Sequence, residues 1–107
     1  MSRIEIGGKY ALRLMSYQGS TMVNICDLEL IGTQIEQDKF AIKLTKEFFQ
    51  QEIIEGKLAD KLLLECSIAN LAGQRIVARA IKLKLANEVT VKNISGVPFL
   101  MIYKFQS

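Results

Sequence analysis

Three basic residues at helical spacing are the group in this chain whose chemistry points most directly to a ligand. Arg75, Arg79 and Lys82 stand at positions i, i+4 and i+7, so all three lie on one side of a predicted helix. Their surroundings are basic too, because residues 66–107 hold six basic residues and a single acid, Glu88. Positive charge gathered on one side of a rigid element is typical of proteins that bind polyanions, RNA above all. The alternative is a solvated helix face that binds nothing.

We therefore predict an RNA-binding surface along this helix and the C-terminal strands, made of Arg75, Arg79, Lys82, Lys84, Lys92, Lys104 and Asn70. The basic side chains would contact phosphates, which position a protein on RNA without reading its bases. Asn70 has two interpretations, since its amide can contact a base or phosphate or can join the helix to a neighbouring strand. Specificity would come from the shape of a folded RNA or from neighbouring proteins.

Cys26 beside Asp27 is a candidate nucleophile next to an acid, but Asp27 and Glu29 would raise the pKa of the thiol, so a structural strand position is favoured. Asp27, Glu29 and Asp38 are candidate ligands for a divalent cation, although acids at a strand end more often cap turns. The chain has no histidine, which removes the commonest general base and the commonest metal ligand. We predict a protein that is not an enzyme, with no cofactor, no metal and no small-molecule substrate.

The composition is that of one folded domain, residues 1–107, with 50% hydrophobic and 23% charged residues. Its apolar runs are far shorter than the roughly 20 residues that span a bilayer, and its N-terminus lacks the apolar core of a signal peptide. These features favour a cytoplasmic protein without membrane contact. Cys26 and Cys66 fit that compartment as two reduced thiols, with a structural disulfide as the less favoured alternative.

The elements that must position these residues begin with strands at 10–16, 21–27 and 40–44, the third of them preceded by a turn at Asp38-Lys39 that pairs it with 33–36. The first two form a hairpin around a turn at 18–20. Leu12 and Leu14 are expected to face the core. Arg13 and Asn24 are expected to point away from it.

Aromatic residues divide into candidates for the core and candidates for the surface. Thr45 is the expected N-cap of a short helical turn that brings Phe48 and Phe49 inward. Tyr17 and Tyr103 are the best candidates for exposed rings.

A long helical segment is predicted over 60–86, with Asp60 as its N-cap and Asn87 after its end. Apolar or small residues recur in it at steps of three and four, namely Leu62, Cys66, Ala69, Gly73, Ile76, Ala80 and Leu83. Gly73 marks either close packing of a continuous helix or a break between two helices. Strands at 88–92 and 99–105 complete an α+β domain. Its mainly antiparallel sheet has four to five strands, with the helical segment packed on one face.

Three segments of this layout resemble a known family. Residues 23–32 form a strand ending in Cys-Asp, followed by an acid, a leucine and a glycine; residues 67–75 contain Ile-Ala-Asn-Leu-Ala-Gly; and residues 96–98 read Gly-Val-Pro. In this order they are similar to the archaeal domain of unknown function 424 family. The sequence departs from that pattern at Gln74, where an acid is expected, and at Phe99, where a polar residue or histidine is expected.

The resemblance implies an archaeal cytoplasmic protein with a compact α+β fold, associated with the translation apparatus. Its implied partners are ribosomal RNA or the small ribosomal subunit, with neighbouring ribosomal proteins or translation factors beside them. Together with the basic surface, this favours a non-enzymatic, ribosome-associated RNA-binding protein. The alternative is a protein–protein adaptor without RNA contact, which would use the long hydrophobic strand at 99–105 as an exposed sheet edge.

Overall fold

The computed structural model describes residues 8–104. In chain order its strands and α-helices are β1 (Lys9–Tyr17), β2 (Ser20–Asp27), β3 (Gln34–Gln37), β4 (Phe40–Lys43), α1 (Lys46–Phe49), β5 (Glu52–Glu55), α2 (Gly56–Glu65), β6 (Ile68–Ala72), α3 (Gln74–Lys82), β7 (Lys92–Ile94) and β8 (Val97–Tyr103). A short 3-10 helix, Leu28–Leu30, follows β2, and another, Glu88–Thr90, precedes β7. None of the helices in this part of the chain has the length and apolarity needed to cross a membrane.

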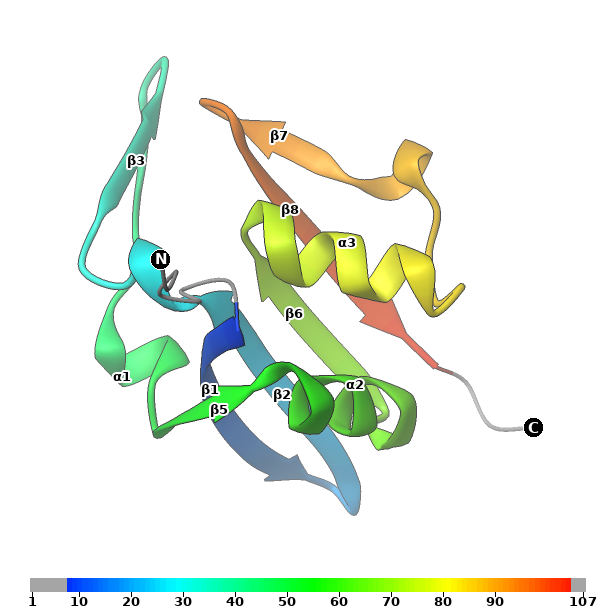
Figure 1. Cartoon of the computed structure of the whole chain (residues 1–107). Coiled ribbons are helices and arrows are strands. Elements are labelled where there is room, and N and C mark those ends of the chain that lie inside the picture. Colours follow the sequence, from blue (N-terminus) through cyan, green and yellow to red (C-terminus); the bar gives the residue numbers. More distant parts are fainter. Residues whose placement is uncertain (1–7, 105–107) are drawn as a thin grey trace, which may run out of the picture.

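The main sheet has six strands in the order β5-β1-β2-β6-β8-β7, and β2 and β6 are its parallel pair while its other pairs are antiparallel. Helices α2 and α3 lie together on one face of this sheet (Figure 1). The α+β class and the mainly antiparallel sheet are therefore confirmed, but the predicted four to five strands were too few. Strands β3 and β4 form a separate hairpin.

Two apolar clusters occupy the two faces of the sheet. The larger one joins side chains of β1, β2, β6 and β8 to α2 and α3, with Ile25, Leu63 and Ile76 fully buried in it. The smaller one lies on the opposite face, where Cys26 and Ala72 pack against Leu44 of the β3–β4 region and Phe49 of α1. The face opposite α2 and α3 is thus covered near this second cluster.

The first hairpin agrees with the sequence, since β1 pairs with β2 across a turn at residues 18–19. The β3–β4 hairpin and its turn at Asp38 are confirmed as well. Leu14 was expected in the core but is 46% exposed, because β5 pairs with β1 only as far as Leu12 and Leu14 lies beyond the end of that pairing; its partner on β2, Val23, is fully buried. Asn24 was expected to point away from the core; it faces the side opposite α2 and α3, yet it is buried there.

A continuous helix over 60–86 is wrong, whereas the alternative of two helices is confirmed, with α3 beginning directly after Gly73. Strand β6 separates α2 from α3, and Asp60 lies inside α2, which begins at Gly56, instead of capping a helix. Asn87 does not end the helix, because α3 stops at Lys82; it caps the 3-10 helix that follows. Residues 68–72 are mostly apolar, and so short a run fits the helical period as well as the strand period. Their position between β2 and β8 in the sheet makes them a strand.

Smaller corrections concern the segments around α1 and the C-terminus. Thr45 accepts a hydrogen bond from the backbone N–H of Phe48, as expected of an N-cap, but the Phe48 ring is 65% exposed instead of turned inward. Residues 88–90 are a 3-10 turn, so the strand expected at 88–92 is reduced to β7. Strand β8 starts earlier than predicted and pairs with β6 and β7, and the expected position Phe105 lies outside the described residues.

Candidate nucleic-acid interface

Helix α3 is anchored at its N-terminus by a carboxylate from a neighbouring strand. Asp27 ends β2, and its two oxygens accept the backbone N–H groups of Arg75 and Ile76, each at 2.9 Å. Gly73 makes this approach possible: its φ is +120°, and a Cβ there would lie 2.4 Å from Cγ of Asp27. Burial raises the pKa of Asp27, while the two backbone N–H donors act in the opposite direction. A protein carboxylate thus occupies the place where a helix N-terminus would hold an anion.

Arg75 is held by acids and does not extend freely into solvent. Its guanidinium contacts both carboxylate oxygens of Glu29, with Nε 3.2 Å from Oε2, and donates to the carbonyl of Lys9 at 3.2 Å. It also lies 4.8 Å from the centre of the Tyr10 ring, a cation–π contact. The hydrogen bond from Arg75 lowers the pKa of Glu29.

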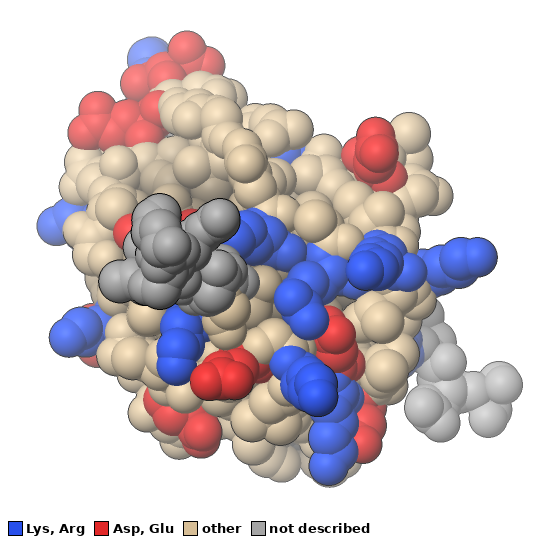
Figure 2. Space-filling view, viewed as in Figure 1, with Lys and Arg blue, Asp and Glu red and all other residues tan. Residues whose placement is uncertain are grey.

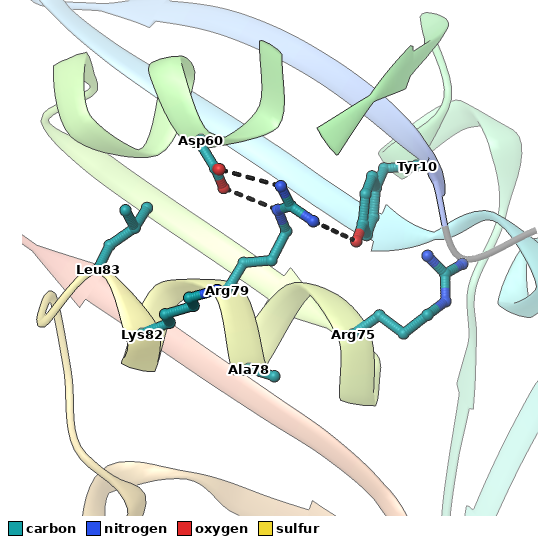
Figure 3. Close-up of a pocket in the computed structure, with 7 residues that line it drawn as sticks. All are labelled: Tyr10, Asp60, Arg75, Ala78, Arg79, Lys82 and Leu83. Carbon is teal, nitrogen blue, oxygen red and sulfur yellow. Dashed lines mark hydrogen bonds and ion pairs between the residues drawn. The ribbon is translucent and has the colours of Figure 1, made fainter. Parts of the chain in front are cut away.

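Arg79 is held in the same way on the other side of Tyr10, as Figure 3 shows. Its Nε and Nη2 donate to the two oxygens of Asp60 at 2.7 and 3.0 Å, and its Nη1 is 3.5 Å from the Tyr10 hydroxyl. Gly56, the first residue of α2, leaves room for it, since a Cβ there would lie 2.6 Å from the guanidinium. Both predicted arginines therefore hold α3 against neighbouring elements and also form part of its surface.

A cavity of about 530 Å³ opens between α2 and α3 and is lined by Tyr10, Asp60, Arg75, Ala78, Arg79, Lys82 and Leu83. Its third basic residue, Lys82, is exposed and forms no ion pair or hydrogen bond within residues 8–104. Lys84 is also exposed, but it lies just beyond the helix, with a φ of +64°. The predicted cluster of Arg75, Arg79 and Lys82 is therefore assembled, with its two arginines balanced by acids.

Two further lysines that the sequence analysis missed lie on the same face. Lys57 and Lys61 are exposed, one turn apart on α2, and neither forms an ion pair or hydrogen bond within the described residues. Figure 2 shows basic side chains over both helices of this face, with acidic ones between them. Their i, i+4 spacing was the available signal. Residues 1–65 contain more acids than bases, however, so the net charge of that half of the chain gives no sign of a basic surface.

The remaining predicted site residues are dispersed. Asn70 lies on β6 and not on a helix; its amide donates to Oδ1 of Asn24 at 2.9 Å, so it joins two strands. Lys92 lies on β7 and lines a separate cavity with Asn70. Lys104 donates to the carbonyl of Leu63 at the end of α2. The structure thus divides the predicted RNA-binding set between two faces of the sheet.

The alternative sites find structural roles. Cys26 is fully buried, and burial, followed by the charges of Asp27 and Glu29, raises the pKa of its thiol to about 12. Cys66 is buried as well, and both cysteines are free. Asp38 lies in the β3–β4 turn, and residues 8–104 contain no cluster of three His, Cys, Asp or Glu side chains suited to a metal ion.

Comparison with known proteins places these observations in a family. The search of curated proteins finds no match. A crystal structure of an uncharacterized conserved protein from Methanopyrus kandleri superimposes with a TM-score of 0.75 at 16% identity, covering 92% of this chain and 96% of that one, and so shares its fold. The profile of a family described as "Protein of unknown function (DUF424)" matches residues 15–105. The chain therefore belongs to the DUF424 family.

Proposed function

We propose that this protein binds RNA without catalysing a reaction, using the face formed by α2 and α3 as its contact with the phosphate backbone. The observation that carries the proposal is the position of four exposed lysines, Lys57 and Lys61 on α2 and Lys82 and Lys84 on and after α3. None of them is paired with an acid in the described part of the chain. Unpaired ammonium groups on one face attract a polyanion and release its counterions on contact.

The arginines have a different role in this proposal. Arg75, Arg79 and their three acids, Asp27, Glu29 and Asp60, hold α3 against β2 and α2. The paired guanidiniums contribute little net charge, because each is neutralised locally. The lysines instead supply the attraction, and the concave surface between the helices supplies the shape. The association with translation that the family resemblance implies leads us to propose ribosomal RNA of the small subunit as this RNA.

This arrangement changes the experiment that tests the basic face. Reversing charge at Arg75 and Arg79 would place acids beside Glu29 and Asp60, so that a loss of binding would not be distinguished from a loss of stability. Reversing Lys82 and Lys84 together avoids this, since both side chains are exposed and unpaired. Lys57→Glu with Lys61→Glu is the equivalent change on α2.

We expect both double variants to bind RNA more weakly and with less dependence on salt. Each phosphate contact contributes about −0.7 to the slope of log affinity against log salt for single strands, so losing two contacts should reduce the slope by about 1.4. Fluorescence anisotropy with ribosomal RNA fragments at several salt concentrations measures this. Co-sedimentation with ribosomal subunits from a native extract tests the partner.

A matched control comes from the β3–β4 hairpin. Lys39→Glu with Lys43→Glu changes the net charge from +3 to −1, as the Lys82 and Lys84 reversal does, but at exposed sites on another element. If the hairpin variant loses as much RNA affinity as the helix variants, the change in overall charge alone explains the loss. If the helix variants bind as the wild type does, or if association with ribosomal particles is insensitive to salt, a protein–protein adaptor becomes the better proposal.

A further inference from the structure

The sheet face opposite α2 and α3 carries a second cavity, separate from the face that bears Lys57, Lys61, Lys82 and Lys84. It has a volume of about 360 Å³, at the lower end of the range for small-molecule sites, and is lined by Phe49, Asn70, Leu71, Thr90, Lys92, Phe99, Leu100 and Met101. By strand register, Asn70, Met101 and Asn24 share this face, which the second apolar cluster covers only in part. Met101 is 54% exposed there.

Two polar groups of this cavity have unused hydrogen-bonding capacity. The amide nitrogen of Asn70 donates to Asn24, and Asn24 in turn donates to the carbonyl of Phe48 at 2.9 Å, so the orientation of the Asn70 amide is set by its neighbours. Its Oδ1 accepts no hydrogen bond within residues 8–104 and is left as an acceptor. Lys92 is exposed and has no partner among the same residues.

The apolar part of the cavity is aromatic. Phe99 and Phe49 are half-buried, and both also belong to the second apolar cluster, which holds their rings in position. A ring held in this way offers a flat face to a base, a contact that tolerates any base because every base has a π-face. An oriented acceptor beside it favours a base with an exocyclic amino donor, which adenine, cytosine and guanine carry; uracil offers only its ring N3–H, at a different position on the base edge.

We propose that this cavity binds one unpaired nucleotide of a single-stranded RNA whose base carries an exocyclic amino group. The base stacks on Phe99, its amino group donates to Oδ1 of Asn70, and Lys92 contacts its phosphate. The proposal shares with the proposed function the assumption that the ligand is RNA, but it uses the opposite face of the sheet. A protein partner would also cover Met101, yet it explains neither the oriented acceptor nor the unpaired lysine.

The first test is an NMR titration of the whole chain with AMP, with UMP as the comparison. We expect the backbone signals of Asn70, Lys92 and Met101 to shift with AMP and to shift less with UMP at equal concentration. Phe99→Leu keeps an apolar side chain but removes the ring, and should weaken AMP binding about tenfold. Tyr103→Leu removes an exposed ring from the same strand at a position that does not line the cavity, and should bind AMP as the wild type does.

The outcomes separate this proposal from the proposed function. Loss of AMP binding in Phe99→Leu, together with unchanged AMP binding in the Lys82→Glu, Lys84→Glu variant, supports the nucleotide site. This holds even if the helix variants bind long RNA as the wild type does. Equal shifts with AMP and UMP would overturn the role of Asn70. Shifts confined to the α2–α3 face, or signals of this cavity that move with protein concentration alone and so report a second copy of the chain, would overturn the site itself.

Discussion

Gly73 is the position where one added methyl group tests the anchoring of α3 most directly. In Gly73→Ala the new Cβ would lie 2.4 Å from Cγ and 2.5 Å from Oδ2 of Asp27, much closer than ordinary van der Waals contact. The backbone is also unfavourable for alanine, since a φ of +120° with a ψ of 151° belongs to a region that is essentially confined to glycine. The substitution therefore strains the backbone and displaces the carboxylate that caps the helix.

The magnitude follows from these two effects. The backbone strain costs about 1–3 kcal/mol. Weakening the hydrogen bonds from Arg75 and Ile76 to an ionised acceptor costs about 1.5–3 kcal/mol for each bond lost. With the strain and the loss of one of these two bonds, the total of about 3–6 kcal/mol is a large part of the roughly 5–15 kcal/mol that stabilises a domain of ordinary size. Since 1 kcal/mol shifts the Tm of a small domain by about 4–8 °C, the melting temperature should fall by about 12 °C or more.

Gly19→Ala is the matched control. Gly19 also has a positive φ, +80°, but a Cβ there would meet nothing within 4 Å, so the cost is the left-handed backbone of about 1–2 kcal/mol. Thermal and urea unfolding followed by circular dichroism measure both variants. A Gly73→Ala protein that is no less stable than Gly19→Ala would refute the close approach of Asp27 to Gly73 and with it the proposed cap.

Three further predictions follow from the core and its ionisable groups. Ala69 is fully buried beneath the helices, so Ala69→Phe should lower the free energy of unfolding by about 1–3 kcal/mol in a urea melt, and an unchanged melt would contradict that packing. Cys26 and Cys66 are buried with raised thiol pKa values, so a thiol reagent should label neither in the native protein and both in denaturant; rapid native labelling would contradict their burial. Because Arg75 lowers the pKa of Glu29, the stability from this pair is present above the ordinary Glu pKa and is lost as the pH falls through the lowered value. The stability difference between wild type and Glu29→Gln should therefore shrink on acidification, and a difference that stays constant with pH would exclude the linkage.

Local pattern alone was enough to predict the two hairpins, the Thr45 cap and the α+β class. Turn residues and alternation of period two act over a few neighbouring positions, so the hairpins around residues 18–19 and Asp38 follow from nearby residues. The basic spacing of Arg75, Arg79 and Lys82 also put all three on one helix, as predicted. The strand β6 was missed because a short apolar run has no period of its own.

Tertiary structure decided what those basic residues contact. Arg75 meets Glu29, 46 positions away, and Arg79 meets Asp60, 19 positions away, because β2, β6 and the two helices pack side by side. The same packing brought Lys57 and Lys61 of the acidic half onto the basic face and placed Asn70 and Lys92 on the opposite one. Spacing along the chain predicts which side chains share an element. Which charges neutralise one another depends on distances that arise only when strands far apart in sequence pair.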